Sequence, residues 1–155
     1  MSTRFKPYAT VALIIENEGR YLVVEEYNED QDNRLVFGNP AGHIEQNESI
    51  IEAALREGRE ETGCEVELLS LISINDYVKE NETIYRFCFE AKIKNLPDVL
   101  KACDPDHEIL AVKWYSKEEI YAKKDLWRTR LVGRNFNDYF KGQRFPLEII
   151  HKERP

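Results

Sequence analysis

Alternation of apolar and polar residues, typical of β-strands, runs through much of the chain. Stretches rich in β-branched and aromatic residues predict strands at several places. They cover residues 8–15, 21–26, 35–37, 65–77, 83–93 and 107–115. A Glu-Asn-Glu-Gly segment separates the first two strands, so we expect them to form a hairpin. The polar stretches 27–33 and 95–106 are expected to be loops, and the glycines and proline of 38–42 to interrupt regular structure.

A helical pattern replaces this alternation after Ser49. Ser49 and Glu52 have the spacing of a capping box, and Gly63 supplies the left-handed conformation with which many helices end. Later elements are a short helix beginning at Ser116, a longer helix over 127–140 and an extended segment over 143–150. Strands with one early helix and two late ones predict an α+β fold, a mixed β-sheet sandwiched between helices (α/β/α), as a single domain over 1–155.

The predicted first helix changes character halfway along. Its apolar stripe begins with Ile50 and Ala54. The same stripe continues at i+7 and i+11 as Glu57 and Glu61, and Glu60 lies beside it. Carboxylates one helical turn apart repel each other and destabilise a helix. A divalent metal ion, which prefers hard oxygen ligands, would compensate them. A solvated acidic face is the alternative, and it explains most charge runs.

Composition and charge narrow the class of partner. The chain has 155 residues, of which 42% are hydrophobic and 33% are charged, as in an ordinary globular protein. Its formal net charge of −7 argues against binding to nucleic acid or to an anionic membrane surface. No apolar run approaches the roughly 20 residues of a membrane span. The three cysteines are widely spaced and fit neither a zinc site nor a disulfide framework. We therefore expect a cytoplasmic protein with a small-molecule partner.

The carboxylates belong to a longer pattern of fixed positions. The pattern is glycine, five residues, glutamate, seven residues, Arg-Glu, two residues, Glu-Glu, one residue and glycine. It is filled by Gly42, Glu48, Arg56, Glu57, Glu60, Glu61 and Gly63. This spacing resembles the signature of Nudix hydrolases, in which Gly42, Glu48 and Gly63 are structural positions. The preceding hairpin, the following strands and the Trp-Tyr-Ser entry to a short helix also resemble the Nudix domain, so the likeness covers nearly the whole chain.

The resemblance implies a metal site. Glu57, Glu60 and Glu61 would bind Mg²⁺, or Mn²⁺ in its place, together with the main-chain carbonyl of Ala41. Mg²⁺ usually takes one or two carboxylates and completes its shell with water and substrate phosphates. Glu48 lies before the predicted helix and away from the acidic stripe, so we assign it a supporting or second-metal role.

The resemblance also suggests the other catalytic residues. Arg56 would hold the carboxylates in place by bidentate hydrogen bonding; a surface pair with Glu52 is the alternative. Glu57 and Glu60 are the first candidates for the general base. Glu108, in the Asp-Pro-Asp-His-Glu segment, is the candidate from a loop, and a surface acid at the start of a strand is its alternative explanation.

Substrate contacts are expected outside the acidic helix. Arg4 and Lys6 lead into the first strand and Arg86 lies within the strand at 83–93, so each can meet a phosphate, although solvated side chains are more common. His43 is expected to be structural or to lie on the substrate side, and not to bind metal. Candidates for stacking on a heterocycle, with the core as the alternative, are Tyr8, Tyr27 and Trp127.

Gly58 departs from the family pattern, which usually has a bulky aliphatic residue there. Glycine costs about 1 kcal/mol of helix propensity. We therefore expect Gly58→Leu to stabilise the fold and to leave the metal site intact.

These features predict an Mg²⁺-dependent Nudix pyrophosphohydrolase or phosphatase, either a monomer or a homodimer. Nucleoside di- or triphosphates are the expected substrates. Segments flanking the pattern resemble a subgroup of small phosphatases in the family, which implies thiamine-pathway pyrophosphates, namely thiamine pyrophosphate and hydroxymethylpyrimidine pyrophosphate. Hydrolysis of ADP-ribose or dinucleoside polyphosphates is one alternative. A non-catalytic Nudix module that binds a nucleotide is another, although such modules usually lose a carboxylate of the pattern.

Overall fold

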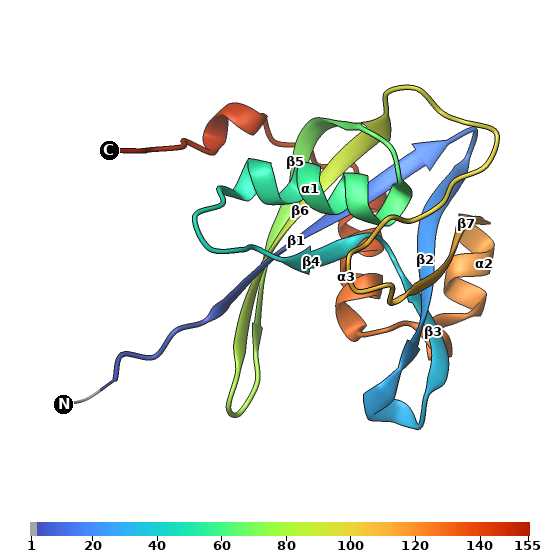
Figure 1. The fold of residues 1–155 in the computed structure, drawn as a ribbon, viewed down its shortest axis with the longest axis horizontal. Coiled ribbons are helices and arrows are strands. Elements are labelled where there is room, and N and C mark those ends of the chain that lie inside the picture. The colour runs from blue at the N-terminus through green and yellow to red at the C-terminus, as the bar shows by residue number, and fades with distance from the viewer. Residues whose placement is uncertain (1–2) are drawn as a thin grey trace.

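The strands and helices follow one another in nearly the predicted order (Figure 1). The computed structural model describes residues 3–155. The strands are β1 (Tyr8–Asn17), β2 (Arg20–Asn28), β3 (Arg34–Gly38), β4 (Ala41–His43), β5 (Val66–Val78), β6 (Thr83–Ile93) and β7 (Ile109–Ser116). The helices are α1 (Ile50–Thr62), α2 (Lys117–Ala122) and α3 (Arg130–Lys141), with 3₁₀ turns at Glu29–Gln31, Lys124–Leu126 and Leu147–Ile149.

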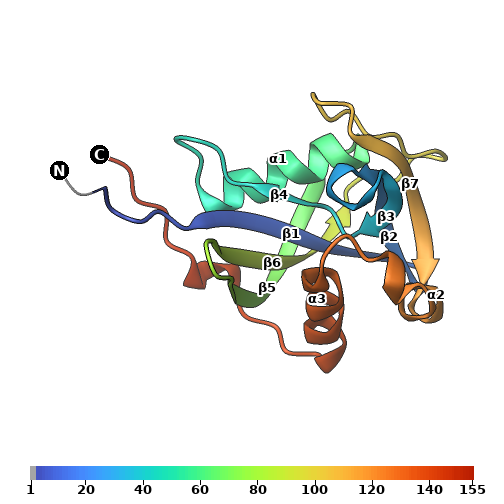
Figure 2. The same ribbon diagram turned by 90° about the horizontal axis from the view of Figure 1, so that it is seen from below.

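The sheet lies between α1 and α3. Its strands are ordered β3-β2-β1-β6-β5, while β4 pairs with β1 and β7 with β2. β1 and β6 are parallel and the other pairs are antiparallel, so the sheet is mixed. Figure 2 shows α1 on one face of the sheet and α3 on the opposite face. This arrangement confirms the predicted α+β fold.

β1 contributes to the core on both faces of the sheet. Successive side chains of a strand point to opposite faces, so a strand covered on both sides is apolar throughout. The cluster on the α1 side includes Val11, Leu13, Ile15, Ala53 and Ala54. The cluster on the α3 side includes Ala12, Ile14, Val132 and Phe136. Both helices are therefore fixed relative to β1, the strand that pairs with β4 and so with Gly42.

Some boundaries differ from the predictions. β4 falls within the segment 38–42 and its flank, where regular structure was expected to stop. α3 begins three residues later than predicted because the Thr129 side chain caps it, accepting a hydrogen bond from the Leu131 N–H at 3.2 Å. The C-terminal segment predicted to be extended contains a 3₁₀ turn. No helix within residues 3–155 is long and apolar enough to cross a membrane.

The expectation that Gly58→Leu stabilises the fold is wrong. Gly58 is buried, and a Cβ at this position would lie 2.6 Å from Val66 Cγ2 and 3.0 Å from Leu13 Cδ1. α1 therefore approaches β5 and β1 so closely that a larger side chain does not fit. Overpacking of a core costs about 1–3 kcal/mol, which offsets the roughly 1 kcal/mol of helix propensity that a leucine would add.

Candidate active site

Local hydrogen bonds fix both ends of α1. Ser49 Oγ accepts from the Glu52 N–H at 3.1 Å, and a Glu52 carboxylate oxygen accepts from the Ser49 N–H at 3.0 Å. Gly63 has φ of 75° and donates its N–H to the Arg59 carbonyl at 2.8 Å. These caps set where the helix begins and ends, and so which face its acidic residues occupy.

The acidic stripe of α1 lies largely out of solvent. The side chains of Glu57 and Glu60 are 12% and 21% exposed, and Glu61 is 4% exposed. Arg56 Nη1 donates to Glu57 Oε1 at 2.9 Å and to Glu60 Oε2 at 3.1 Å. Glu61 Oε2 accepts from the Ala41 N–H at 3.1 Å. The three carboxylates are thus not a solvated acidic face.

Arg56 connects the helix to the loop that precedes it. Its Nε and Nη2 donate to the two carboxylate oxygens of Glu48 at 2.6 and 3.0 Å. Nη2 also donates to the His43 carbonyl at 2.9 Å, and Glu48 accepts from the Glu45 N–H at 2.9 Å. The Arg56 hydrogen bond is the main cause that lowers the pKa of Glu48. Arg56 therefore pairs with Glu48, and not with Glu52 on the surface.

Burial raises the pKa of two carboxyls of the stripe, in contrast to the lowered pKa of Glu48. Burial raises the pKa of Glu57, against the lowering effect of the Arg56 guanidinium. Burial also raises the pKa of Glu61 well above its ordinary value, although Arg128 and the Ala41 N–H act against it. Buried carboxylates are costly unless a cation or several donors compensate them. A bound cation would lower both pKa values and stabilise the ionised stripe.

Gly42 leaves space for the Glu57 carboxylate. A Cβ on residue 42 would lie 2.1 Å from Glu57 Oε1, so only glycine allows this approach. As the side chains stand, no three His, Cys, Asp or Glu residues of the part described, 3–155, are arranged around one metal position. The donor set nevertheless fits Mg²⁺, because three carboxylates within one and a half turns offer hard oxygen ligands on a common face.

The stripe lines a cleft of about 540 Å³. Acidic residues from a second segment, Asp104, Asp106 and Glu108, line it as well. This segment is attached to α1, since the Cys103 N–H donates to the Glu60 carbonyl at 2.6 Å. Partial burial, and after it Glu26 and Asp106, raise the pKa of Glu108. Carboxylates outnumber guanidinium groups in this lining, so an anionic substrate requires cations to enter.

The structure brings only some of the predicted substrate residues to this cleft. Arg86 and His43 line it. Arg4 and Lys6 do not, because residues 3–7 form an exposed segment that leads away from the sheet (Figure 1). Tyr27 does not line it either and is 58% exposed, since its strand neighbour Glu26 points into the cleft.

Arg128 and Glu26 are cleft residues that the sequence did not indicate. Arg128 Nη1 pairs with Glu26 Oε1 at 3.0 Å, and its backbone N–H donates to the Phe37 carbonyl at 2.8 Å. No local signal identifies Arg128, because its partners belong to β2 and β3. Its neighbour Trp127 packs its ring on Gly133, where a Cβ would lie 2.2 Å from the indole.

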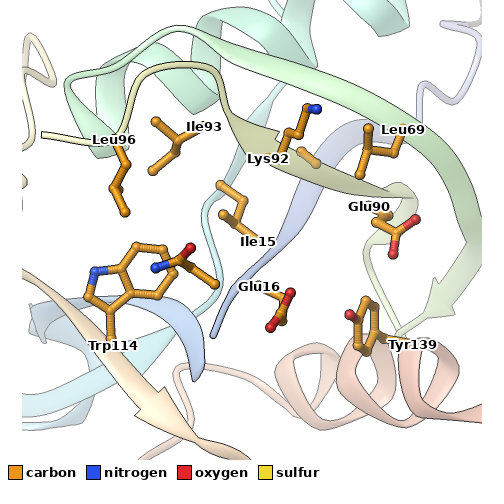
Figure 3. Close-up of a pocket in the computed structure, with 11 residues that line it drawn as sticks. Ile15, Glu16, Leu69, Glu90, Lys92, Ile93, Leu96, Trp114 and Tyr139 are labelled. Atoms are coloured by element: carbon orange, nitrogen blue, oxygen red, sulfur yellow. The ribbon is translucent and has the colours of Figure 1, made fainter. Parts of the chain in front are cut away.

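Other cavities lie outside this cleft, and two of them have volumes of about 300 Å³ or more. One is about 300 Å³, with Trp114 and Leu96 at one end and Tyr139 and Glu90 at the other (Figure 3). Its carboxylate Glu90 is already bonded, to Ser70 at 3.1 Å and Arg144 at 3.3 Å. The second cavity is about 700 Å³ and lies between β5 and α3. Neither combines a carboxylate stripe with buried guanidinium groups.

Comparison with known proteins agrees with this geometry. The family model of the NUDIX domain matches residues 5–136. The chain therefore belongs to the Nudix hydrolase family, and it is an enzyme that acts on phosphoanhydride bonds.

Particular relatives share most of the chain. It is 35% identical over 147 residues to the Phosphatase NudJ of Escherichia coli and of Shigella flexneri, which covers 94% of this chain and 92% of the relative. A NUDIX hydrolase structure from Nitrosomonas europaea has a TM-score of 0.85 and 36% identity, covering 96% of this chain and 98% of that one. The MutT protein from Methanosarcina mazei, at TM-score 0.70 and 19% identity over 92% of this chain and 100% of that one, shares the fold.

Proposed function

We propose that this Nudix enzyme is an Mg²⁺-dependent pyrophosphohydrolase or phosphatase that acts on nucleoside di- or triphosphates or on thiamine-pathway pyrophosphates. The observation that carries the proposal is the stripe of Glu57, Glu60 and Glu61, withdrawn from solvent beside a cleft that also holds Arg86 and Arg128. A purely structural helix would gain nothing from three such carboxylates.

The chain's own residues suggest how the metal ion is held. Glu57, Glu60 and Glu61, with the carbonyl of Ala41, would hold Mg²⁺, or Mn²⁺ in its place. When bound, such an ion lowers the pKa of a coordinated water and neutralises charge that develops on phosphate oxygens. Arg56 keeps Glu57 and Glu60 oriented through its hydrogen bonds at 2.9 and 3.1 Å. Glu48 in turn fixes the Arg56 guanidinium, which is a supporting role.

Glu108 is the general base in this proposal, ahead of Glu57 and Glu60. The two helix carboxylates are engaged by Arg56, and their expected task is to bind metal. Glu108 lies on an exposed part of the cleft lining, and its raised pKa favours acceptance of a proton from water. Its loop is ordered by the Asp104 carboxylate, which accepts from the Glu108 N–H at 2.6 Å.

The cavity between β5 and α3 supports a substrate with a heterocyclic group. Asn75 on its lining is the β-sheet partner of Arg86 in the cleft, and Trp127 on its lining precedes Arg128. The two linings share no residue, but they contain neighbouring residues at these two points. Tyr77 and Trp127 offer aromatic surfaces, which are typical of sites that bind bases. Nucleosides and the thiamine-pathway compounds share this chemistry.

A hydrolysis screen that detects phosphate, pyrophosphate and nucleoside monophosphate as products tests the proposal. Purified protein would be incubated with nucleoside di- and triphosphates, thiamine pyrophosphate, hydroxymethylpyrimidine pyrophosphate, ADP-ribose and a dinucleoside polyphosphate, with Mg²⁺ or with EDTA. We expect Mg²⁺-dependent hydrolysis of nucleoside di- or triphosphates, or of the two thiamine-pathway pyrophosphates. Turnover of the same substrates should be lost in Glu61→Gln. Turnover that survives EDTA contradicts the metal assignment. Binding of nucleotides without any turnover indicates a non-catalytic module.

A further inference from the structure

Arg86 is a buried cation that forms no ion pair with the described residues. It lies on β6 and is 7% exposed. Its Nε donates to Thr10 Oγ1 at 3.1 Å, whereas Nη1 is buried and has no hydrogen-bond partner within residues 3–155. No carboxylate in the described part of the chain lies within ion-pair distance of Arg86, although its guanidinium carries five N–H donors; Glu61 acts on it only through its charge, from farther away. A buried guanidinium in this state is costly and requires an explanation.

A second guanidinium lies close by. The Arg128 side chain is 19% exposed, pairs with Glu26 and lines the same cleft as Arg86. Burial lowers the pKa of Arg86 to about 10, and the positive charge of Arg128 is the next cause. Two like charges that share a low-dielectric site repel each other. An anion placed between them would relieve the repulsion and supply the acceptor that Arg86 Nη1 lacks.

We propose that Arg86 and Arg128 form an anion subsite in the cleft, which holds a phosphoryl group of the substrate directly, beside the groups that the metal ion holds. The proposal rests on the proposed function and deepens it. Guanidinium groups suit this task because their planar donors match two oxygens of one phosphate. The subsite makes substrate affinity depend on a phosphoryl group that reaches Arg86.

The acidic side chains that line the cleft require that phosphate binding be tested in the presence of Mg²⁺. Glu57, Glu60 and Glu61 repel a phosphate when no cation is present, so binding is measured on protein saturated with Mg²⁺. The probe is inorganic phosphate, titrated by calorimetry. The variants Arg86→Gln and Arg128→Gln each remove one guanidinium. Arg20→Gln is the matched control, because Arg20 is 57% exposed, pairs with Glu119 and lies outside the cleft lining.

The expected result is a loss of phosphate affinity of at least about tenfold in both cleft variants, with the affinity of Arg20→Gln unchanged. In turnover assays KM should rise by a similar factor in the cleft variants. Their Mn²⁺ affinity, measured by electron paramagnetic resonance, should change far less than their phosphate affinity, because neither residue binds the metal and each acts on Glu61 only through its charge. Arg86→Lys keeps the positive charge but lacks the planar donors of the guanidinium, so it should recover only part of the phosphate affinity. It replaces Arg86→Gln in the test if that variant does not fold.

Wild-type phosphate affinity and KM in both cleft variants would overturn the subsite. So would an equal loss in Arg20→Gln, which would indicate a general effect of net charge. These outcomes differ from failure of the proposed function, in which the wild-type protein itself hydrolyses none of the substrates in the presence of Mg²⁺.

Discussion

Gly42→Ala would add a single methyl group where the Glu57 carboxylate lies. The new Cβ would fall 2.1 Å from Oε1 and 2.3 Å from Cδ, so the carboxylate has to move by about 1 Å or more to reach van der Waals distance. The substitution does not strain the backbone, because the φ angle of Gly42 is not in the left-handed region and alanine can adopt it. The perturbation therefore acts on the carboxylate and hardly on the fold.

The size of the effect follows from that displacement. A misplacement of about 1 Å at a catalytic group can cost about 100-fold in rate. This corresponds to about 2.7 kcal/mol of transition-state stabilisation. The free energy of unfolding should change by less than about 1 kcal/mol, because replacing glycine where alanine fits the backbone is mildly stabilising through the unfolded state.

The assay compares kcat/KM at saturating Mg²⁺ with urea unfolding for wild type, Gly42→Ala, Glu57→Gln and the double variant. Gly42→Ala should lose about 100-fold alone but no more than about threefold in the Glu57→Gln background, because both changes act on one group. Wild-type turnover in Gly42→Ala would refute the steric argument. A full 100-fold loss on top of Glu57→Gln would show that the methyl group acts elsewhere.

Other predictions concern stability and the general base. Gly58→Leu should lower the free energy of unfolding by up to about 2 kcal/mol in urea, because overpacking costs about 1–3 kcal/mol and helix propensity returns about 1. Adding Val66→Ala should recover part of the loss, and a more stable Gly58→Leu contradicts the packing. Hydrogen bonds from Ser49, and after them Arg154, lower the pKa of Glu52 to about 2. The ionised Glu52 carboxylate therefore contributes to the free energy of unfolding above the ordinary carboxyl pKa, and this contribution is lost as the pH falls toward 2. The stabilities of wild type and Glu52→Gln should converge in acid. A stability difference that persists in acid would contradict the role of the Glu52 carboxylate in capping α1. Glu108→Gln should lower kcat at least about 100-fold with unchanged melting temperature. A loss below about tenfold would indicate that Glu57 or Glu60 is the general base.

The ends of α1 could be predicted to the residue because its capping interactions are local. Ser49 and Glu52 bond each other within one turn, and Gly63 needs only its own backbone freedom to end the helix. The spacing of the carboxylates likewise determines which helix face they share, and the structure has that face turned out of solvent. Strand positions followed from alternation, which depends on neighbours in the sequence.

Contacts between distant segments could not be predicted in this way. The pair of Arg128 and Glu26 joins residues 102 positions apart. The space around Gly58 depends on Val66, whose placement requires the whole sheet. The chemistry of Tyr27 predicts a substrate contact, but strand alternation turns this side chain away because Glu26 faces the cleft.

Metal binding by the α1 carboxylates is the central claim, and a Mn²⁺ titration followed by electron paramagnetic resonance tests it without any substrate. Wild type should bind Mn²⁺ and Glu61→Gln should lose at least about tenfold in affinity, while Glu65→Gln, which removes an exposed carboxylate beyond the helix, should match wild type. Equal Mn²⁺ affinity in wild type and Glu61→Gln would contradict the claim that this stripe is the metal site.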